Sequence, residues 1–561
     1  MLKNKKGISV FLAVIMMIAI LTAGCAGDKG KSSEQDPGVI AQTDKQNGNG
    51  GKRGSTDKPQ ETNGFPIFEE PITLKIMARY RQPMAEFGDM ITWQEYEKLT
   101  NIKIDWIMVD TANMQERRNL ALATGDIPDA FLKCSFTSLD LLKYGKEGTF
   151  ISLNNFLDAN APNYKKILDD EENYPGVKKA VTMADGNVYS FINIVDKDFD
   201  SLKYGKYFMN RKWLNALGKA MPVTTDDFCD VLKAFREEDP NGNGKKDEIP
   251  WYPLNLNSAI GILKGAWGLN NRGFKSDLVD FDEEEKKLRF IPTDPSYKEL
   301  LEYVHKLYTE ELINQEVFTA SLADLLAKGT EDSIGAFSAA GNTFVGDEHQ
   351  DDFEGLEHAF KGPHGDQLWP STNLQAYTIG SFVITSKNKY PEETMKWVDY
   401  FYTREGQKLY YLGKEGLTYT ENEQGDPEFL EVITKNPDGL QLNDALAQYV
   451  PYAVGDNPAL LSPKYFQGVE TLPIPTEAAK RMKPYGLKEV WPAFNYTEDE
   501  NDKMVALSND IGQYVTEKSA DFVTGKAPFS DWDSYVQTIE KMGLDQYMEI
   551  QEEAFKRYSE Q

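Results

Sequence analysis

The stretch Ile72-Thr73-Leu74-Lys75-Ile76-Met77-Ala78 predicts a β-strand, because apolar residues recur at alternate positions within it. Residues 102–109 alternate in the same way, and a short third strand is predicted at 128–132. Residues 93–99 and 114–123, which separate these strands, have the pattern of helices. Strands that alternate with helices at this spacing predict a βαβ sheet with helices on its faces.

Helices dominate the prediction for the rest of the chain. One further strand is predicted at 381–385. The predicted helices cover residues 211–217, 225–238, 295–310, 391–409, 498–516 and 532–558. No internal repeat of fixed period is visible. We therefore expect an α/β fold with two lobes and a helical C-terminal portion.

Length and charge restrict the class of protein. The 561 residues favour two to four domains, and a content of 40% hydrophobic and 27% charged residues is typical of globular proteins. The net charge of −28 argues against binding of nucleic acid, whose phosphates require a basic surface. It also disfavours anionic ligands, although a local basic pocket would override the overall charge.

The N-terminus has the pattern of a secretory signal. Three lysines lie within the first six residues, and Ile8 to Leu21 is almost wholly apolar, which is too short for a first interpretation as a membrane-spanning helix. The stretch Leu21-Thr22-Ala23-Gly24-Cys25 then resembles the bacterial lipobox. That resemblance implies cleavage of residues 1–24 and acylation of Cys25, which anchors the chain to a membrane. The alternative is an ordinary secreted protein with a chance cysteine.

A linker is predicted between the signal and the folded body. Residues 25–64 are rich in Gly, Ser, Asn, Gln and Lys and contain no aromatic residue, so they cannot bury enough apolar surface to fold. The ordered body is predicted to cover 66–558. Within it, Cys134 and Cys229 are expected to be two buried thiols rather than a disulfide.

The sharpest local motif is Asp239-Pro240-Asn241-Gly242-Asn243-Gly244-Lys245-Lys246-Asp247-Glu248. Side-chain oxygens recur at every second position before a glycine turn, as Ca²⁺ requires when it takes six to eight hard oxygens at about 2.3–2.6 Å. The motif departs from the EF-hand pattern at Pro250, where a bidentate Glu is expected. Mg²⁺ fits less well, and the alternative is a polar turn without an ion. The predicted ligands are Asp239, Asn241, Asn243, the Lys245 carbonyl, Asp247 and Glu248.

Several aromatic residues lie in polar, turn-rich surroundings. A sugar site needs flat aromatic faces beside polar side chains, and the chain has 9 Trp, 28 Tyr and 29 Phe to draw on. Packing in the core is the alternative for each of them. The predicted ligand contacts are Tyr80, Trp93, Trp267, Arg272 and Trp369.

No convincing catalytic constellation is visible. The four histidines form no HExxH motif, and neither a GxSxG nucleophile elbow nor a phosphate-binding GxxxxGK[ST] loop occurs. A glycosidase needs only two carboxylates at a suitable separation, and with 89 acidic residues that class stays open.

The ordered set of motifs resembles family 1 of the bacterial extracellular solute-binding proteins, in the large lipoprotein branch that includes the alginate-binding proteins of ABC importers. The stretches that carry the resemblance are the lipobox, 120–129, 185–189, 210–214, 225–250, 411–416, 491–494 and 530–535. The resemblance implies a periplasmic-binding-protein-like fold in which two lobes close on a carbohydrate, expected to be an oligosaccharide. It also implies delivery to a permease and supports the calcium ligands named above.

The resemblance sets the expected organisation. The N-lobe is expected at about 66–200 plus a returning middle segment, and the C-lobe at about 205–365 plus the C-terminal helices. We expect a monomer, not an enzyme, that is lipid-anchored on the extracellular face of the cell membrane, with structural calcium. A surface-anchored polysaccharide-degrading enzyme and a sensor that presents solute to a membrane receptor are the alternatives.

Overall fold

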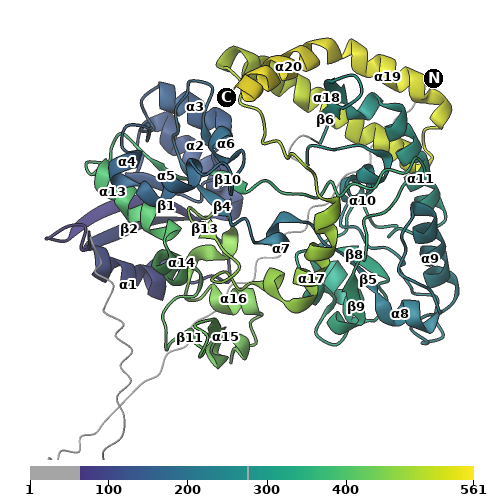
Figure 1. Ribbon diagram of the computed structural model, residues 1–561, viewed down its shortest axis with the longest axis horizontal. Coiled ribbons are helices and arrows are strands. Elements are labelled where there is room, and N and C mark those ends of the chain that lie inside the picture. The colour runs from purple at the N-terminus through teal and green to yellow at the C-terminus, as the bar shows by residue number, and fades with distance from the viewer. Residues whose placement is uncertain (1–63, 274–276, 561) are drawn as a thin grey trace, which may run out of the picture. The chain divides into compact units, whose positions relative to one another are not determined.

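The computed structural model describes residues 64–273 and 277–560 (Figure 1). The predicted signal, Cys25 and almost all of the linker lie outside the described residues. By its contacts, the chain from Asn63 onward forms one unit. Within the described ranges, every helix is too short or too polar to cross a membrane.

The first lobe is built on a six-stranded sheet with the order β13-β4-β10-β3-β1-β2. The predicted parallel pairing is confirmed for β1 with β2 and for β1 with β3, whereas β10 runs antiparallel between β3 and β4. The strands are β1 (Ile72–Tyr80), β2 (Ile102–Asp110), β3 (Ala130–Leu132), β4 (Phe191–Val195), β10 (Ala376–Ile384) and β13 (Leu460–Leu461). Two of the six strands, β10 and β13, therefore come from the second half of the chain.

Helices pack around this sheet (Figure 1). They are α1 (Ile91–Thr100), α2 (Met114–Thr124), α3 (Ser138–Lys146), α4 (Leu157–Asn160), α5 (Pro162–Leu168), α6 (Val177–Val181), α13 (Pro391–Asp399), α14 (Arg404–Tyr411), α15 (Glu431–Thr434) and α16 (Leu442–Leu446). A small hairpin of β11 (Tyr419–Glu421) and β12 (Pro427–Phe429) lies beside them. Ile76, Phe191 and Trp397 belong to the core that the sheet and helices share.

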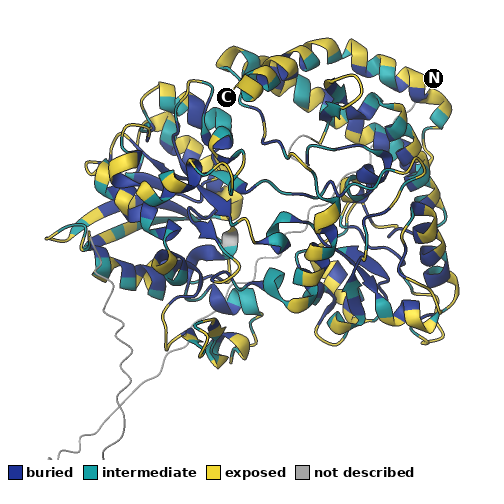
Figure 2. Cartoon of the chain, in the orientation of Figure 1, coloured by how far each residue is buried: buried dark blue, intermediate teal, exposed yellow. Residues whose placement is uncertain are grey.

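The second lobe has a smaller sheet and longer helices. Its three strands have the order β8-β5-β9, with β5 (Tyr207–Asn210) between β8 (Ala336–Ser338) and β9 (Phe353–Gly355). A separate hairpin pairs β6 (Val279–Asp282) with β7 (Lys287–Phe290). The helices are α8 (Arg211–Ala216), α9 (Thr225–Glu237), α10 (Leu256–Leu263), α11 (Pro295–Thr309), α12 (Leu322–Thr330), α17 (Pro473–Met482), α18 (Glu498–Thr524), α19 (Trp532–Lys541) and α20 (Leu544–Glu560). Figure 2 shows buried residues gathered inside each lobe.

Three segments carry the chain between the lobes. The first follows β4 and contains the short helix α7 (Asp200–Lys203). The second, residues 371–375, leads back into β10, and the third, residues 462–472, leads from β13 to α17. We call these three segments the connectors. The hydrophobic cores on their two sides are separate, which is the arrangement that allows one lobe to move relative to the other.

Two predicted helices are each divided in the structure. The prediction of one helix at 391–409 is wrong, because a 3-10 turn at Tyr400–Tyr402 separates α13 from α14 and the Thr403 hydroxyl caps α14. The prediction of one helix at 532–558 is also wrong, because Gly543 has φ of +102° between α19 and α20. The expectation of two buried free thiols, Cys134 and Cys229, is confirmed.

Candidate functional site

Three adjoining cavities lie where the second lobe meets the connectors. Their volumes are about 380, 260 and 90 Å³, and Ile262 and Ser338 line all three. We call the three together the interlobe cleft. The largest alone falls within the range of small-molecule sites, roughly 300–1,000 Å³. Its polar lining residues include Asn257, Ser258, Asn270, Ser371, Thr516 and Ser519, so hydroxyl and amide groups are abundant.

The cavity of 260 Å³, here called the hinge-side cavity, is lined by residues of all three connectors. The first contributes Ser201, Leu202, Tyr204, Gly205 and Lys206, the second Ser371 and Asn373, and the third Glu470. Tyr377 enters from β10 of the first lobe, and Ser338 enters from β8 of the second. A molecule in this cavity would therefore contact both lobes and the segments that join them.

Two opposite charges line the hinge-side cavity: Lys206, which is buried, and Glu470, which is half-buried. The Lys206 side chain donates from Nζ to the Ser201 carbonyl oxygen at 2.6 Å, and the residue is 6% exposed. Burial lowers the pKa of Lys206 to about 8, with the Glu470 charge opposing that shift. Burial raises the pKa of Glu470, against the opposing effects of a backbone hydrogen bond and of Lys206. The cavity thus holds a cation and an anion at sites that water does not screen well.

A polar cluster lies at the carboxyl ends of β1 and β3 in the first lobe. Ser135 donates from its backbone N and its Oγ to the Asp456 carboxylate at 2.9 and 3.1 Å, and Ser381 Oγ donates to it at 2.9 Å. Arg79 Nη2 lies 3.6 Å from the same carboxylate. We call these residues, with Lys133, the sheet-edge cluster. The carboxyl ends of parallel strands are where open α/β sheets bind ligands.

The backbone of the sheet-edge cluster is strained. Lys133, Ser135 and Asp456 have φ of +58°, +54° and +56°, a region that costs non-glycine residues about 1–3 kcal/mol each. The buried Lys133 Nζ donates to the Gly455 carbonyl oxygen at 2.7 Å, and burial lowers the pKa of Lys133. Strain that three neighbouring residues share is typical of a functional site, where the surrounding structure maintains it.

The structure places three predicted sugar platforms in the hydrophobic cores. Trp93, Trp267 and Trp369 are 5%, 4% and 0% exposed, and Trp93 packs among Trp106, Trp397 and other rings. A ring buried on both faces has no surface for a sugar, so the interpretation of these three as ligand contacts is wrong. The polar residues that flank them in the sequence belong to turns at the surface and do not describe the surroundings of the rings.

The other two predicted contacts differ from each other. Arg272 stacks on the rings of Phe281 and Trp491 and forms an ion pair with Glu283 at 2.5 Å, and it does not line the interlobe cleft. Tyr80 is half-buried at the last position of β1, directly after Arg79 of the sheet-edge cluster. Of the five predicted contacts, Tyr80 remains a candidate.

The predicted metal loop folds around its own oxygen atoms. The Asp239 carboxylate accepts from the backbone N of Asn243 at 3.1 Å and of Gly244 at 3.0 Å. Asn241 Oδ1 and Asn243 Oδ1 accept from backbone N atoms of the loop, at 3.0 and 2.7 Å. Gly242 and Gly244 have φ of +71° and +74°, which allows the tight turn. The loop begins directly after α9, as the sequence predicted.

Glu248 closes this loop with an unsatisfied carboxylate. Its Oε1 atom is buried and has no hydrogen-bond partner among the described residues. Burial raises the pKa of Glu248, and Asp247 and Asp239 raise it further, because like charges lie nearby. Three carboxylates on one loop supply the hard oxygen donors that Ca²⁺ takes.

A group of different character adjoins the metal loop. Asp332, His349 and Asp352 have ligand atoms within 4.8 Å of one another, and the Asp332 carbonyl accepts from Asn241 Nδ2 at 3.0 Å. Lys212 Nζ lies 2.8 Å from Asp332 and 3.3 Å from Asp352. A cation therefore already balances these carboxylates, and we regard the group as a support for the loop.

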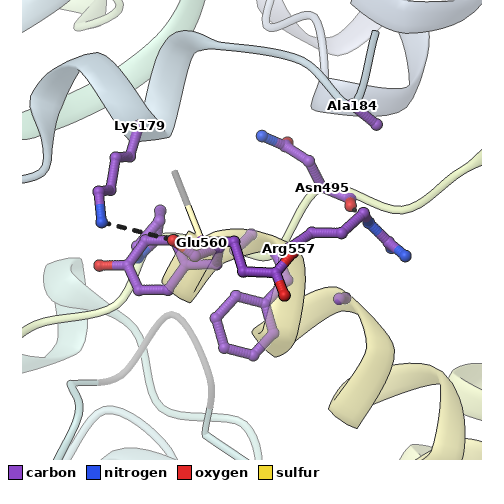
Figure 3. A pocket seen from close by; sticks show the side chains of 10 residues that line it. Lys179, Ala184, Asn495, Arg557 and Glu560 are labelled. Atoms are coloured by element: carbon purple, nitrogen blue, oxygen red, sulfur yellow. Dashed lines mark hydrogen bonds between the residues drawn. The ribbon is translucent and has the colours of Figure 1, made fainter. Parts of the chain in front are cut away.

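A second interlobe contact lies at the chain terminus. A cavity of about 260 Å³ separates α6 of the first lobe from α20 of the second, and Lys179, Asn495 and Arg557 line it (Figure 3). Lys179 Nζ donates to the Tyr558 carbonyl oxygen at 3.4 Å and lies 5.1 Å from the centre of the Tyr558 ring. Asn495 Nδ2 donates to the Thr182 carbonyl oxygen at 2.8 Å. These contacts join the lobes at a distance from the interlobe cleft.

No local sequence motif marks the residues that line the cleft. Lys206, Ser371, Tyr377 and Glu470 are separated by up to 264 positions and meet because the chain crosses between lobes three times. None of them lies in a motif. The one signal that could have located them is the topology of the chain. If the predicted strand at 381–385 returns to the first sheet, the residues just before it must lie where the chain crosses between the lobes.

The chain is similar to known proteins in both sequence and structure. A family model described as bacterial extracellular solute-binding protein matches residues 92–438. The fructooligosaccharide ABC transporter substrate-binding protein FusA of Streptococcus pneumoniae serotype 4 is 30% identical over 522 residues, which cover 90% of this chain and 94% of FusA. The structure of FusA with kestose has a TM-score of 0.70 at 27% identity and covers 87% of this chain and 99% of that one. A FusA EF-hand mutant with fructo-nystose gives 0.69 at 26% identity, with the same coverage.

Two proteins of Bacillus subtilis are also similar. Lipoprotein LipO is 27% identical over 392 residues, which cover 67% of this chain and 73% of LipO. The polygalacturonan/rhamnogalacturonan-binding protein YtcQ is 22% identical over 389 residues, which cover 66% of this chain and 71% of YtcQ. The similar proteins thus include one named for a neutral saccharide, FusA, and one named for acidic saccharides, YtcQ.

Proposed function

This chain belongs to the family of bacterial extracellular solute-binding proteins, and from that premise we propose that it captures an oligosaccharide in the interlobe cleft and delivers it to an ABC transporter permease. The observation that carries the proposal is the hinge-side cavity, which all three connectors line. FusA, which is 30% identical, is a substrate-binding protein of an ABC transporter, and this supports binding of the solute without chemical change. Hydroxyl and amide groups in the lining suit a polyhydroxylated ligand.

The mechanism is a shift between two lobe arrangements. A ligand that contacts both lobes binds the closed form more tightly than the open form, and it shifts the population by that difference in affinity. The two cores support the proposed division into an N-lobe at about 66–200 plus the returning middle segment and a C-lobe at about 205–365 plus the C-terminal helices. Tyr80 and the sheet-edge cluster are the proposed N-lobe contacts.

Calorimetry tests the proposed capture. We expect heat of binding when kestose, nystose, maltotriose or lacto-N-tetraose is titrated into the protein in calcium-containing buffer, with recovery of the sugar intact by chromatography. Absence of binding to every neutral and acidic oligosaccharide tested would contradict the proposal, as would newly formed reducing ends.

We propose that the metal loop holds a structural Ca²⁺. The donor set fits the ion: carboxylates of Asp239, Asp247 and Glu248, amide oxygens of Asn241 and Asn243, and the carbonyl of Lys245. The unsatisfied Glu248 Oε1 supports the assignment. The existence of an EF-hand mutant of the similar protein FusA is consistent with such a loop. The ion would fix the loop and the turn at Asp332 beside it.

Removal of calcium tests this assignment. Calcium at about 1,000 times its dissociation constant stabilises a folded protein by about 4 kcal/mol, so chelation should lower the melting temperature. The variant Glu248→Gln should lose most of that response. Glu302→Gln, an exposed residue on α11, is the matched control and should keep it. An equal response in all three proteins would exclude the loop as the binding site.

We also propose that the mature chain is a lipid-anchored monomer on the extracellular face of the membrane. The lipobox-like residues up to Cys25 support this proposal, as does similarity to a lipoprotein. Mass spectrometry of protein from its native membrane should find an N-terminal diacylated cysteine at Cys25. A mature N-terminus elsewhere would contradict the anchor.

A further inference from the structure

The Glu470 carboxylate is an unusual feature of the hinge-side cavity. Its Oε2 atom is buried and has no hydrogen-bond partner among the described residues, although the side chain lines a cavity. A buried acceptor without a partner is costly, and a charged one more so. In a binding protein, a ligand donor is the natural partner for such an atom.

Lys206 does not satisfy this carboxylate directly. Its Nζ is directed to Ser201, 2.6 Å from the carbonyl oxygen and 3.5 Å from Oγ. Lys206 therefore compensates the charge of Glu470 over a distance and donates no hydrogen bond to Oε2. A negatively charged ligand group in the cavity would meet no basic side chain in the lining other than Lys206, which already donates to Ser201.

The backbone of Glu470 is held in place by the same serine. The Ser201 hydroxyl donates to the Glu470 carbonyl oxygen, so Ser201 joins the first connector to the third. Tyr204 and Tyr377 also line the cavity. The carboxylate is thus preorganised, and little ordering remains when a ligand arrives.

We propose that Glu470 is a specificity-determining residue: it accepts hydrogen bonds from the hydroxyls of a neutral sugar ring and excludes a ring that carries a carboxylate. This inference rests on the proposed function and narrows it, because proteins similar to this chain are named for neutral and for acidic saccharides. The cavity of about 260 Å³ is large enough for a single hexose or pentose ring of a longer ligand.

The test is calorimetry on four calcium-loaded proteins: the native sequence, Glu470→Gln, Glu470→Asp and Glu477→Gln. The probes are kestose, nystose, maltotriose, lacto-N-tetraose and trigalacturonate. Glu477 is the matched control, because it is an acid of α17 that pairs with Arg481 and does not line the cavity. We expect the native protein to bind at least one neutral probe and to bind trigalacturonate at least tenfold more weakly.

Glu470→Gln should bind the neutral probe about 10- to 100-fold more weakly, the value of a hydrogen bond to a charged group, and should discriminate less against trigalacturonate. Glu470→Asp should recover part of the affinity, and Glu477→Gln should match the native protein. Unchanged affinity and discrimination in Glu470→Gln would overturn the inference while leaving the proposed function intact.

Two further outcomes are decisive. Preference of the native protein for trigalacturonate would overturn the inference without need of any variant, so misfolding of Glu470→Gln does not leave the matter open. Absence of binding to every probe would overturn the proposed function itself. Circular dichroism and melting temperature establish folding of each protein before titration.

Discussion

Some of the single residues considered as ligand contacts pack in a hydrophobic core, and others remain candidates for binding the ligand. Trp267 is buried beside Tyr303, whereas Tyr80 is half-buried at the end of β1. We therefore expect Trp267→Ala to lower the free energy of unfolding by about 3–5 kcal/mol and to leave oligosaccharide affinity within twofold. Tyr80→Ala should do the reverse, weakening binding with little loss of stability. Chemical denaturation measures the stability of the two variants, and calorimetry measures their affinity. A Trp267→Ala protein that is stable but binds weakly would show that Trp267 contacts the ligand.

Asp399 gives the protein a pH dependence of its own. Its buried carboxylate accepts from the backbone N atoms of Tyr164 and Asn163 at 2.7 and 3.2 Å, at the start of α5. Burial nevertheless raises its pKa to about 6 from 3.8. The folded chain therefore binds more protons than the unfolded chain between these values, so this residue's contribution to stability falls as pH rises from about 4 to 6, by about 3 kcal/mol.

Asp399→Asn removes this titration. Urea unfolding at pH 4, 5, 6 and 7 should show that the free energy of unfolding of the native protein declines over this interval. The decline should be shallower in the variant, by a slope equivalent to up to one bound proton. Asp158→Asn, whose side chain is 85% exposed, is the control and should keep the native slope. Parallel curves for the native protein and Asp399→Asn would refute the role of this carboxylate.

At the scale of elements, a glycine separates α19 from α20. Gly543 has φ of +102°, and a Cβ there would lie 2.9 Å from Leu507 Cδ2. Gly543→Ala should lower the free energy of unfolding by about 1–3 kcal/mol. Gly512 is the contrast, because it lies inside α18 in open space, and Gly512→Ala should stabilise by about 0.5–1 kcal/mol. Equal effects of the two substitutions would contradict the assigned turn.

The same elements show what local sequence can predict. β1 and β2 were predicted within two residues because alternation of apolar side chains is a local property. The division of α13 from α14 was missed, because it depends on how closely Gly406 approaches the Tyr400 carbonyl, a contact that composition does not reveal. The loop that we propose to bind calcium could be proposed from the sequence because all its oxygens lie within ten residues. The cleft was not, because it depends on three crossings between lobes.

At the scale of the whole molecule, the contact of α6 with α20 is expected to favour the closed form. Lys179→Ala removes the contact of Lys179 with the Tyr558 ring, and we expect oligosaccharide affinity to fall about two- to fivefold, the value of one exposed cation–π contact. Lys178→Ala is the matched control, since Lys178 pairs with Asp169 of its own lobe at 2.7 Å. Identical affinities in the two variants would show that the α20 contact is neutral to closure.

The strand order of the first sheet has a consequence for biogenesis. β4 has β10 and β13 as its neighbours, and both are synthesised at least 180 residues later. In a chain secreted from its N-terminus, β4 lacks at least one of its two neighbours until residue 461 has emerged, and such an open edge promotes aggregation. The order of the strands therefore makes the chain vulnerable during its export, well before any solute reaches it.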